Sequence, residues 1–310
     1  YMDNGYIPLE DMVEEAFHTN EQTSRTLEYA YDDYAVAQMA KALHDSCQDA
    51  TLRQKYLEDY NDLMRRSENW RNVINPVTGW ADGRYENGKW ENNEDLVHRK
   101  SYITEGATCH YTWYVPQNPE GLFEVIRNSK PMDKQEKQIE KTERKMEKKG
   151  ETPVRNEKVI ARLDKMFDNG WYWHGNEPCH QVAYLYDAAG APEKTQERVH
   201  RILQTEYNDT PGGLSGNDDA GQMSAWYVFS SIGFYPVCPG TPYYYIGTPS
   251  FDKVTLNLEN GRKFILSADG VSKDAFYIQK MSLNDKPFWG YKLSHKDILN
   301  GGKLKFQMKK

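Results

Sequence analysis

The chain has 310 residues, enough for one large domain or two ordinary ones with a substantial core and no covalent staples. Its formal net charge is -7, and its one dense basic stretch, residues 134–155, is interleaved with Glu and not with aromatic residues, which argues against a nucleic-acid partner. No apolar run reaches the roughly 18 residues of a membrane span, and the cysteines show neither CxxC spacing nor pairing with His, which argues against a zinc site or a disulfide framework.

Apolar residues at spacings of three and four predict helices in chain order. The first covers residues 23–46, with Thr23 and Ser24 as possible caps, and a short link joins it to an antiparallel partner at 51–74. Residues 75–101 are rich in turn residues and predict a long irregular loop, of a length that usually builds a site or is disordered. Further helices are predicted at residues 120–130, 158–168, 177–189, 192–206 and 219–232.

Residues 133–155 alternate Lys and Glu with hardly any apolar side chains. Such a stretch can form a solvated helix through pairs four residues apart, but it cannot bury a face. We therefore expect a surface excursion without catalytic importance.

The repetition of helix, loop and helix predicts a toroid of helical hairpins, with functional loops at one end of each pair. After Gly240 the pattern changes to short alternating stretches separated by Gly and Asn, which predict strands. These strands are residues 243–246, 253–258, 263–266, 275–278 and 303–306. The predicted fold is mainly α: a helical domain over residues 1–240, followed by a C-terminal β segment over 241–310 that is too small and too rich in edges to be self-sufficient.

Aromatic residues make up 13% of the chain, including 8 Trp and 22 Tyr. Their flat faces suit the apolar C–H faces of sugars, although the ordinary interpretation is that they fill contacts between helices. Three junctions of loop and helix gather polar residues beside these aromatics: residues 104–113, 173–178 and 216–222.

Three carboxylates stand out at these junctions. Glu105, followed by Gly106 in a stretch without clear periodicity, has the weakest structural explanation. Asp219 with Gln222 three residues later equally fits a capping box, and Glu177 before a proline equally fits an ordinary helix start.

Glycoside hydrolysis fits such residues, because it needs one carboxylic acid to protonate the leaving oxygen and one carboxylate to activate water. Glu105 and Asp219 are the candidates. Asn176, Glu177 and neighbouring carbonyl groups offer hard oxygen ligands of the kind that Ca²⁺ prefers, although the sequence contains no EF-hand loop. No nucleophile elbow, phosphate-binding glycine loop or dinucleotide fingerprint appears.

Four stretches carry longer motifs: Thr26-Leu-Glu-Tyr-Ala-Tyr-Asp-Asp33, Gly175-Asn-Glu-Pro-Cys-His-Gln181, and residues 210–229 and 231–236. They resemble the α-mannosidases of glycoside hydrolase family 92. The resemblance extends from the first helix to the start of the β segment, and the final strands carry no motif.

This resemblance implies an (α/α)6 toroid that hydrolyses terminal α-mannosyl residues with inversion, assisted by a Ca²⁺ ion that binds the 2- and 3-hydroxyls of the sugar and helps to distort its ring. It implies Glu105 as general acid and Asp219 as general base, with carboxyl groups roughly 6.5 to 9.5 Å apart. Asn176 and Glu177 match the motif beside the metal. The residues expected to contact the substrate are Trp113, Trp173, His174, Asn217 and Asp218.

Two departures from the family pattern bear on this expectation. Where the family usually continues Glu-Gly with Asn-Ala-Trp-Gln, this chain has Ala107-Thr-Cys-His110, which puts leaving-group recognition and activity in question. Family members are also much longer, beginning with a β-sandwich and the first helices of the toroid. We therefore expect a C-terminal fragment that folds but hydrolyses mannosides poorly by itself, and a parent protein that is periplasmic or extracellular.

Two other functions compete with this one. A glycan-binding protein on the same scaffold would have lost turnover through residues 107–110 while its aromatics still hold sugar. Another (α/α)6 carbohydrate enzyme, such as a polysaccharide lyase, would favour acidic polymers and a basic cleft, which the acidic balance of this chain argues against.

Overall fold

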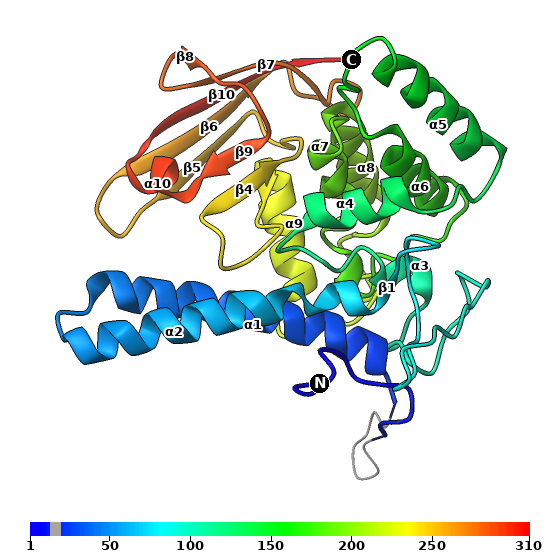
Figure 1. The fold of residues 1–310 in the computed structure, drawn as a ribbon. Coiled ribbons are helices and arrows are strands. Elements are labelled where there is room, and N and C mark those ends of the chain that lie inside the picture. Colours follow the sequence, from blue (N-terminus) through cyan, green and yellow to red (C-terminus); the bar gives the residue numbers. More distant parts are fainter. Residues whose placement is uncertain (13–19) are drawn as a thin grey trace. The chain divides into compact units, whose positions relative to one another are not determined.

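The computed structural model describes residues 1–12 and 20–310, and its contacts divide the chain into two compact units, residues 1–172 and residues 173–310. Helices dominate the first unit, and strands follow the helices of the second (Figure 1). The predicted class, mainly α with a C-terminal β segment, is thereby confirmed. The predicted domain boundary after residue 240 stays a prediction.

The first unit combines helices with a two-stranded sheet. Its elements are α1 (Gln22–Ser46), α2 (Ala50–Arg66), the 3₁₀ turn η1 (Ser67–Asn72), β1 (Ile74–Asn75), β2 (Trp80–Ala81), α3 (Thr108–Tyr111), α4 (Pro119–Asn128), α5 (Lys134–Glu147) and α6 (Glu157–Asp168).

α1 and α2 form the predicted pair, lying side by side along their length (Figure 1). The cap of α2 is Asp49, whose side chain accepts a hydrogen bond from the backbone N–H of Leu52 at 2.9 Å. The caps predicted for α1 are wrong, because Thr23 and Ser24 lie inside the helix. The Thr23 hydroxyl instead donates to the carbonyl oxygen of Asp82 at 3.1 Å, tying α1 to the loop that follows β2.

The Lys- and Glu-rich stretch forms a helix as predicted, but the prediction that it buries no face is wrong. Acidic residues of α5 and its N-cap meet basic residues of α6 in antiparallel order, an arrangement that we call the charge ladder. Its pairs are Asp133 with Lys165 at 2.6 Å, Glu136 with Arg162 at 3.2 Å, and Glu140 with Lys158 at 2.9 Å.

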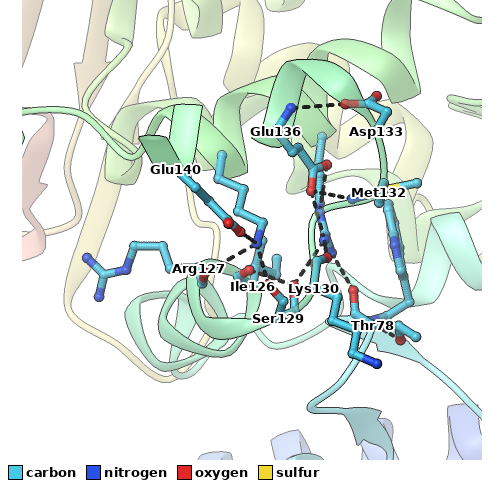
Figure 2. A network of polar contacts seen from close by, with 12 residues as sticks. Thr78, Ile126, Arg127, Ser129, Lys130, Met132, Asp133, Glu136 and Glu140 are labelled. Atoms are coloured by element: carbon cyan, nitrogen blue, oxygen red, sulfur yellow. Dashed lines mark hydrogen bonds and ion pairs between the residues drawn. The ribbon is translucent and has the colours of Figure 1, made fainter. Parts of the chain in front are cut away.

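The middle rung of the charge ladder is fully buried, with both side chains 0% exposed. Arg162 also donates to the carbonyl oxygen of Thr78 at 2.8 Å, and the ammonium of Lys158 donates to that of Ser129 at 2.6 Å (Figure 2). The ladder therefore joins α5 and α6 to the segment after β1 and to the end of α4. A helix that looks wholly solvated in sequence is a packed part of this unit.

The second unit begins with short helical turns and ends in strands. Its elements are η2 (Glu177–Cys179), η3 (Val182–Tyr184), α7 (Leu185–Ala188), α8 (Pro192–Thr205), α9 (Gln222–Ile232), β3 (Phe234–Tyr235), β4 (Tyr243–Ile246), β5 (Lys253–Asn257), β6 (Lys263–Asp269), β7 (Tyr277–Leu283), β8 (Lys286–Pro287), β9 (Lys292–Ser294), α10 (His295–Leu299) and β10 (Gly302–Lys309).

The helix predicted at residues 177–189 is instead a series of three short turns. Its first turns close through bonds between residues three apart, such as the N–H of His180 to the carbonyl oxygen of Glu177 at 2.9 Å. α8 begins as predicted at Pro192, where a missing N–H costs no helical bond.

The strands form two sheets with an apolar core. One has the order β3-β4-β9, and the other, visible in Figure 1, has the order β5-β6-β10-β7-β8. β10 runs parallel to β6 and antiparallel to β7. Phe264, Leu304 and Phe306 of this larger sheet are almost fully buried. The strand predicted at residues 275–278 begins later, at Tyr277.

Candidate active site

Glu105 lies on an exposed loop of the first unit, in a backbone conformation that non-glycine residues rarely adopt. Its φ angle is 48°. The neighbouring Thr104 fixes the loop to α1, because its backbone N–H donates to the hydroxyl of Ser24 at 3.0 Å and the two hydroxyls lie 2.8 Å apart. The loop therefore presents Glu105 to solvent from a defined support.

The residues that depart from the family pattern lie beneath this loop. Ala107, Thr108 and Cys109 are at most 2% exposed. His110 accepts a hydrogen bond from the N–H of Ala107 on Nδ1 at 3.2 Å, and its Nε2 donates to the carbonyl oxygen of Trp171 at 2.8 Å. Burial lowers the pKa of His110. The departure thus falls on three buried residues and one half-buried residue next to the loop.

A second carboxylate supports the same region. The Tyr111 hydroxyl donates to Glu28 of α1 at 3.0 Å, and burial raises the pKa of Glu28. Sequence reasoning missed this residue, although it lies in the motif at residues 26–33. Glu28 lies four residues after Ser24, so both side chains occupy the same face of α1.

Trp113 does not lie at the surface of this loop. Its side chain is fully buried, and its ring packs edge-on against Trp80 at 6.1 Å between centroids. The predicted contact between Trp113 and a sugar stays a prediction, and the burial of the indole gives it no support.

In the second unit, two glycines bring the two polar loops together. A Cβ atom on Gly175 would lie 2.4 Å from the carbonyl oxygen of Ser215, and one on Gly216 would lie 2.3 Å from the carbonyl oxygen of Gly175. Only a residue without a side chain permits this approach. Asn176 and Asn217 directly follow these glycines, so the segments at residues 174–177 and 216–219 start from one point of contact.

The loop that carries Asp219 enters α9 through three consecutive residues with left-handed backbone. Their φ angles are 38° at Asp219, 56° at Ala220 and 90° at Gly221. The capping box that Asp219 and Gln222 could form is absent, because the N-cap is Gly221 and the side chain that accepts from the first turn of α9 is that of Asp218. Asp219 and Asn217 are exposed. The structure thus leaves Asp219 available for chemistry.

Asp218 and Trp173 have different surroundings. The carboxylate of Asp218 accepts from the backbone N–H of Ser224 at 2.8 Å and from its hydroxyl at 2.9 Å. Asp218 is therefore engaged in holding the first turn of α9. Trp173 exposes 42% of its surface beside Gly175, which leaves it accessible to a ligand.

His174 and His180 form a buried cluster with aromatic residues behind these loops. The two imidazole rings stack at 4.7 Å, and His174 lies edge-on to Trp226 at 4.4 Å. Burial lowers the pKa of His174 to about 2 and that of His180 to about 4. His174 is only 1% exposed and lies 2.6 Å from the Tyr207 hydroxyl, so its surroundings give no support to the predicted contact with substrate, which stays a prediction.

The predicted metal ligands lie on the same segment. Asn176 is 7% exposed, and the amide nitrogen of its side chain is buried without a hydrogen-bond partner. Nitrogen and oxygen of an amide exchange places by a simple flip, so this position can present an oxygen. Beside it, Glu177 adds a carboxylate, and both groups suit Ca²⁺ chemically. Within residues 1–12 and 20–310, no cluster of three or more His, Cys, Asp or Glu side chains forms a ready metal site.

Comparison with known proteins identifies the family. The sequence profile of the glycosyl hydrolase family 92 catalytic domain matches residues 1–310. The chain belongs to glycosyl hydrolase family 92. It is 36% identical to a family 92 α-mannosidase of Bacteroides thetaiotaomicron, with a TM-score of 0.79, covering 99% of this chain and 36% of that one. It is also 32% identical to a family 92 inverting mannosidase of the same organism, with a TM-score of 0.80. That match covers 100% of this chain and 39% of the mannosidase.

A curated relative gives a similar result. The chain is 28% identical over 333 residues to an uncharacterized secreted glycosidase of Arthroderma benhamiae, covering 99% of this chain and 38% of the relative. This family 92 chain therefore spans less than two fifths of the length of the relatives that it matches. Among the residues that the structure describes, none of the helices has both the length and the apolar character that crossing a bilayer requires.

Proposed function

We propose that the protein carrying this chain is a glycoside hydrolase that removes terminal α-linked mannose from glycans, with Glu105 as general acid and Asp219 as general base. One observation carries the residue assignment: both carboxylates are exposed, and both occupy left-handed backbone positions on loops that rigid neighbours support. Such backbone persists where the surrounding structure holds it, and it concentrates at functional sites.

In the proposed reaction a water molecule attacks the anomeric carbon while the bond from that carbon to the leaving oxygen breaks. Asp219 takes a proton from the water, and Glu105 gives its proton to the leaving oxygen. The sugar is released with inverted configuration, and exchange with solvent returns both carboxyl groups to their starting states. A relative named as an inverting mannosidase supports this stereochemistry. The separation of the two carboxyl groups stays a prediction.

Ca²⁺ belongs to the same proposal, with Asn176 and Glu177 among its ligands. When bound, the ion would orient and polarise hydroxyl groups of the terminal sugar. Two protein ligands are fewer than the six to eight oxygens that Ca²⁺ takes, so backbone carbonyls, water, the sugar or other parts of the protein complete the set. Trp173 and Asn217, both exposed, are the proposed sugar contacts of this unit. We further propose a toroid completed by sequence outside this chain, and export from the cytoplasm, which the description of the fungal relative as secreted supports.

The position of residues 107–110 favours a catalytic protein over one that only binds glycans. Ala107, Thr108 and Cys109 are buried and His110 is half-buried, so three of the four residues that depart from the family pattern lie away from the exposed surface around Glu105. The alternative of a non-catalytic glycan-binding protein remains the outcome to be tested.

The test measures mannose release from an aryl α-mannoside by the full-length protein. Glu105→Gln and Asp219→Asn should each lower kcat by about 10²- to 10⁴-fold. Asp209→Asn, an exposed carboxylate in the same unit, serves as the matched control and should keep wild-type turnover. EDTA should abolish activity, and Ca²⁺ should restore it.

Binding of mannose oligomers without any turnover would establish the alternative. Residues 1–310 by themselves should hydrolyse the substrate far more slowly than the full-length protein, because contacts that position the sugar would be missing.

A further inference from the structure

His180 connects the two loops of the second unit through its side chain. Its Nε2 lies 3.0 Å from the carbonyl oxygen of His174, and its Nδ1 lies 3.2 Å from the side-chain nitrogen of Gln222. Gln222 is the first residue of α9 and directly follows the left-handed entry that begins at Asp219. A single imidazole therefore bridges the start of the proposed metal segment and the end of the loop that carries the proposed base.

The hydrogen bonds of this bridge fix one protonation pattern. Gln222 donates one N–H to Nδ1 of His180 and the other to the hydroxyl of Tyr235, at 2.9 Å. Nδ1 of His180 must then be the unprotonated acceptor, so Nε2 carries the hydrogen and donates to the carbonyl oxygen of His174. Every polar atom of the imidazole has a partner, and both amide hydrogens of Gln222 are used.

The backbone of His180 adds two further links. Its N–H donates to the carbonyl oxygen of Glu177 at 2.9 Å, and its carbonyl oxygen accepts from the indole of Trp226 in α9 at 2.9 Å. His180 is 1% exposed, so these bonds form out of water, where an unsatisfied group is costly. The residue thus holds both ends of residues 174–177 and joins them to two positions on α9.

We propose that His180, through Gln222, is a positioning residue that holds Asn176 and Glu177 in register with the loop of Asp219. This inference rests on the function proposed above and deepens it. In this role His180, which is 1% exposed, is not itself a ligand of the metal or a contact of the sugar. Its effect is exerted through the geometry of the loops, in the way that outer-shell hydrogen bonds orient metal ligands.

The test separates positioning from mere stability. His180→Phe keeps an aromatic ring but removes both side-chain bonds, and Gln222→Met keeps length but removes both donors. In the full-length protein, each should weaken Ca²⁺ binding, measured by calorimetry with the metal alone, by about 10- to 100-fold. kcat on an aryl α-mannoside should fall by a similar factor.

Two further variants sharpen the test. His180→Asn places an oxygen near Nδ1 and should keep part of the affinity, because it can still accept from Gln222. Tyr184→Phe is the matched control: it removes a buried hydrogen bond to Ser230, at 2.8 Å, next to the same aromatic cluster but linked to neither loop. This control should change thermal stability without changing Ca²⁺ affinity.

The double variant His180→Phe with Gln222→Met should lose no more affinity than the more affected single variant, because both interrupt one connection. Suppose that the wild type binds Ca²⁺ and releases mannose. If His180→Phe and Gln222→Met then both match Tyr184→Phe in Ca²⁺ affinity and kcat, the positioning role is refuted and the proposed function stands. If wild type does neither, the proposed function fails and the positioning role with it. Should His180→Phe not fold, Gln222→Met and His180→Asn decide the question.

Discussion

The charge ladder and the cluster around His180 are buried polar networks built from opposite kinds of groups. The charge ladder of the first unit pairs full charges, and its middle rung of Glu136 and Arg162 is completely removed from water. The cluster behind the loops of the second unit uses neutral rings and an amide, with His180 and Gln222 at its centre. Burying charges is tolerated only while every charge keeps its partner, whereas neutral groups need only their hydrogen bonds.

This difference matches what each network supports. The charge ladder joins α5 and α6 to the loop at Thr78, a purely structural task. The neutral cluster lies beneath residues proposed to hold a cation and to activate water. Because burial keeps His174 and His180 uncharged, the cluster adds no positive charge that would compete with a bound metal ion. Because the supporting cluster is neutral, the electrostatic potential at the site is set by carboxylates such as Glu177 and Asp219.

The largest effect should come from breaking the charge ladder at its centre. Glu136→Gln leaves the guanidinium of Arg162 buried without its full counter-charge and should lower the free energy of unfolding by about 3 to 5 kcal/mol. Denaturant titration of the full-length protein measures this change. The double variant Glu136→Met with Arg162→Met should be less destabilised than Glu136→Gln, since it leaves no orphan charge.

The matched control for this variant is Asp45→Asn. It breaks an exposed pair on α1, where Lys41 lies 2.6 Å from Asp45, and should have no measurable effect. Equal losses in the buried and the exposed variant would show that burial does not set the cost.

The charge ladder also shows what sequence reasoning could and could not predict. Helix periodicity predicted α6, and the alternation of Lys and Glu predicted α5. The spacing of Lys158, Arg162 and Lys165 already places three cations on one helix face. What the sequence does not state is that this face meets Glu136 and Glu140 in antiparallel order. Pairing between helices is a tertiary property, so alternation of charge was interpreted as full solvation.

The candidate site was predictable to a similar extent. Residue types in polar loops singled out Glu105 and Asp219, and the resemblance gave their roles and drew attention to residues 175–181. The structure shows both carboxylates exposed. The sequence could not distinguish two roles for Asp219: a side chain that caps the helix, or a residue in a left-handed turn just before it. Both arrangements place an Asp near the start of a helix. The resemblance also implied that Trp113 and His174 contact the substrate, and it could not indicate that both rings are buried in the core.

A smaller effect is expected from the glycine contact that joins the loops of the second unit. Gly216→Ala places a methyl group against the backbone of Gly175, which cannot move aside as a flexible side chain would, and should cost about 1 to 3 kcal/mol. Thermal unfolding of the full-length protein reports the loss. Ca²⁺ affinity should fall too, because Asn176 directly follows the displaced residue.

Gly212→Ala, in the same loop, is the control for that substitution. A Cβ at Gly212 meets nothing within 4 Å, so this variant should be neutral or slightly stabilising. If both alanine variants behave alike, the close approach at Gly216 has no energetic importance and the loops are held by the histidine cluster alone.

The smallest effect, counted per pH unit, concerns Asp187, the one acidic side chain that lies buried in α7 of the second unit at 2% exposure. Burial raises the pKa of Asp187 well above its usual value of 3.8, and the nearby Thr195 hydroxyl offsets this only in part. Between the unfolded and the folded pKa the folded state binds more protons, so the free energy of unfolding falls as pH rises above about 4, by at most about 1.4 kcal/mol per pH unit. Asp187→Asn should remove this slope and leave the fold intact, because the amide carries no charge to desolvate. If the free energies of unfolding of wild type and Asp187→Asn change in parallel from pH 4 upward, the Asp187 carboxyl does not contribute to the pH dependence of stability. The second unit would then tolerate a buried charge as the first unit does.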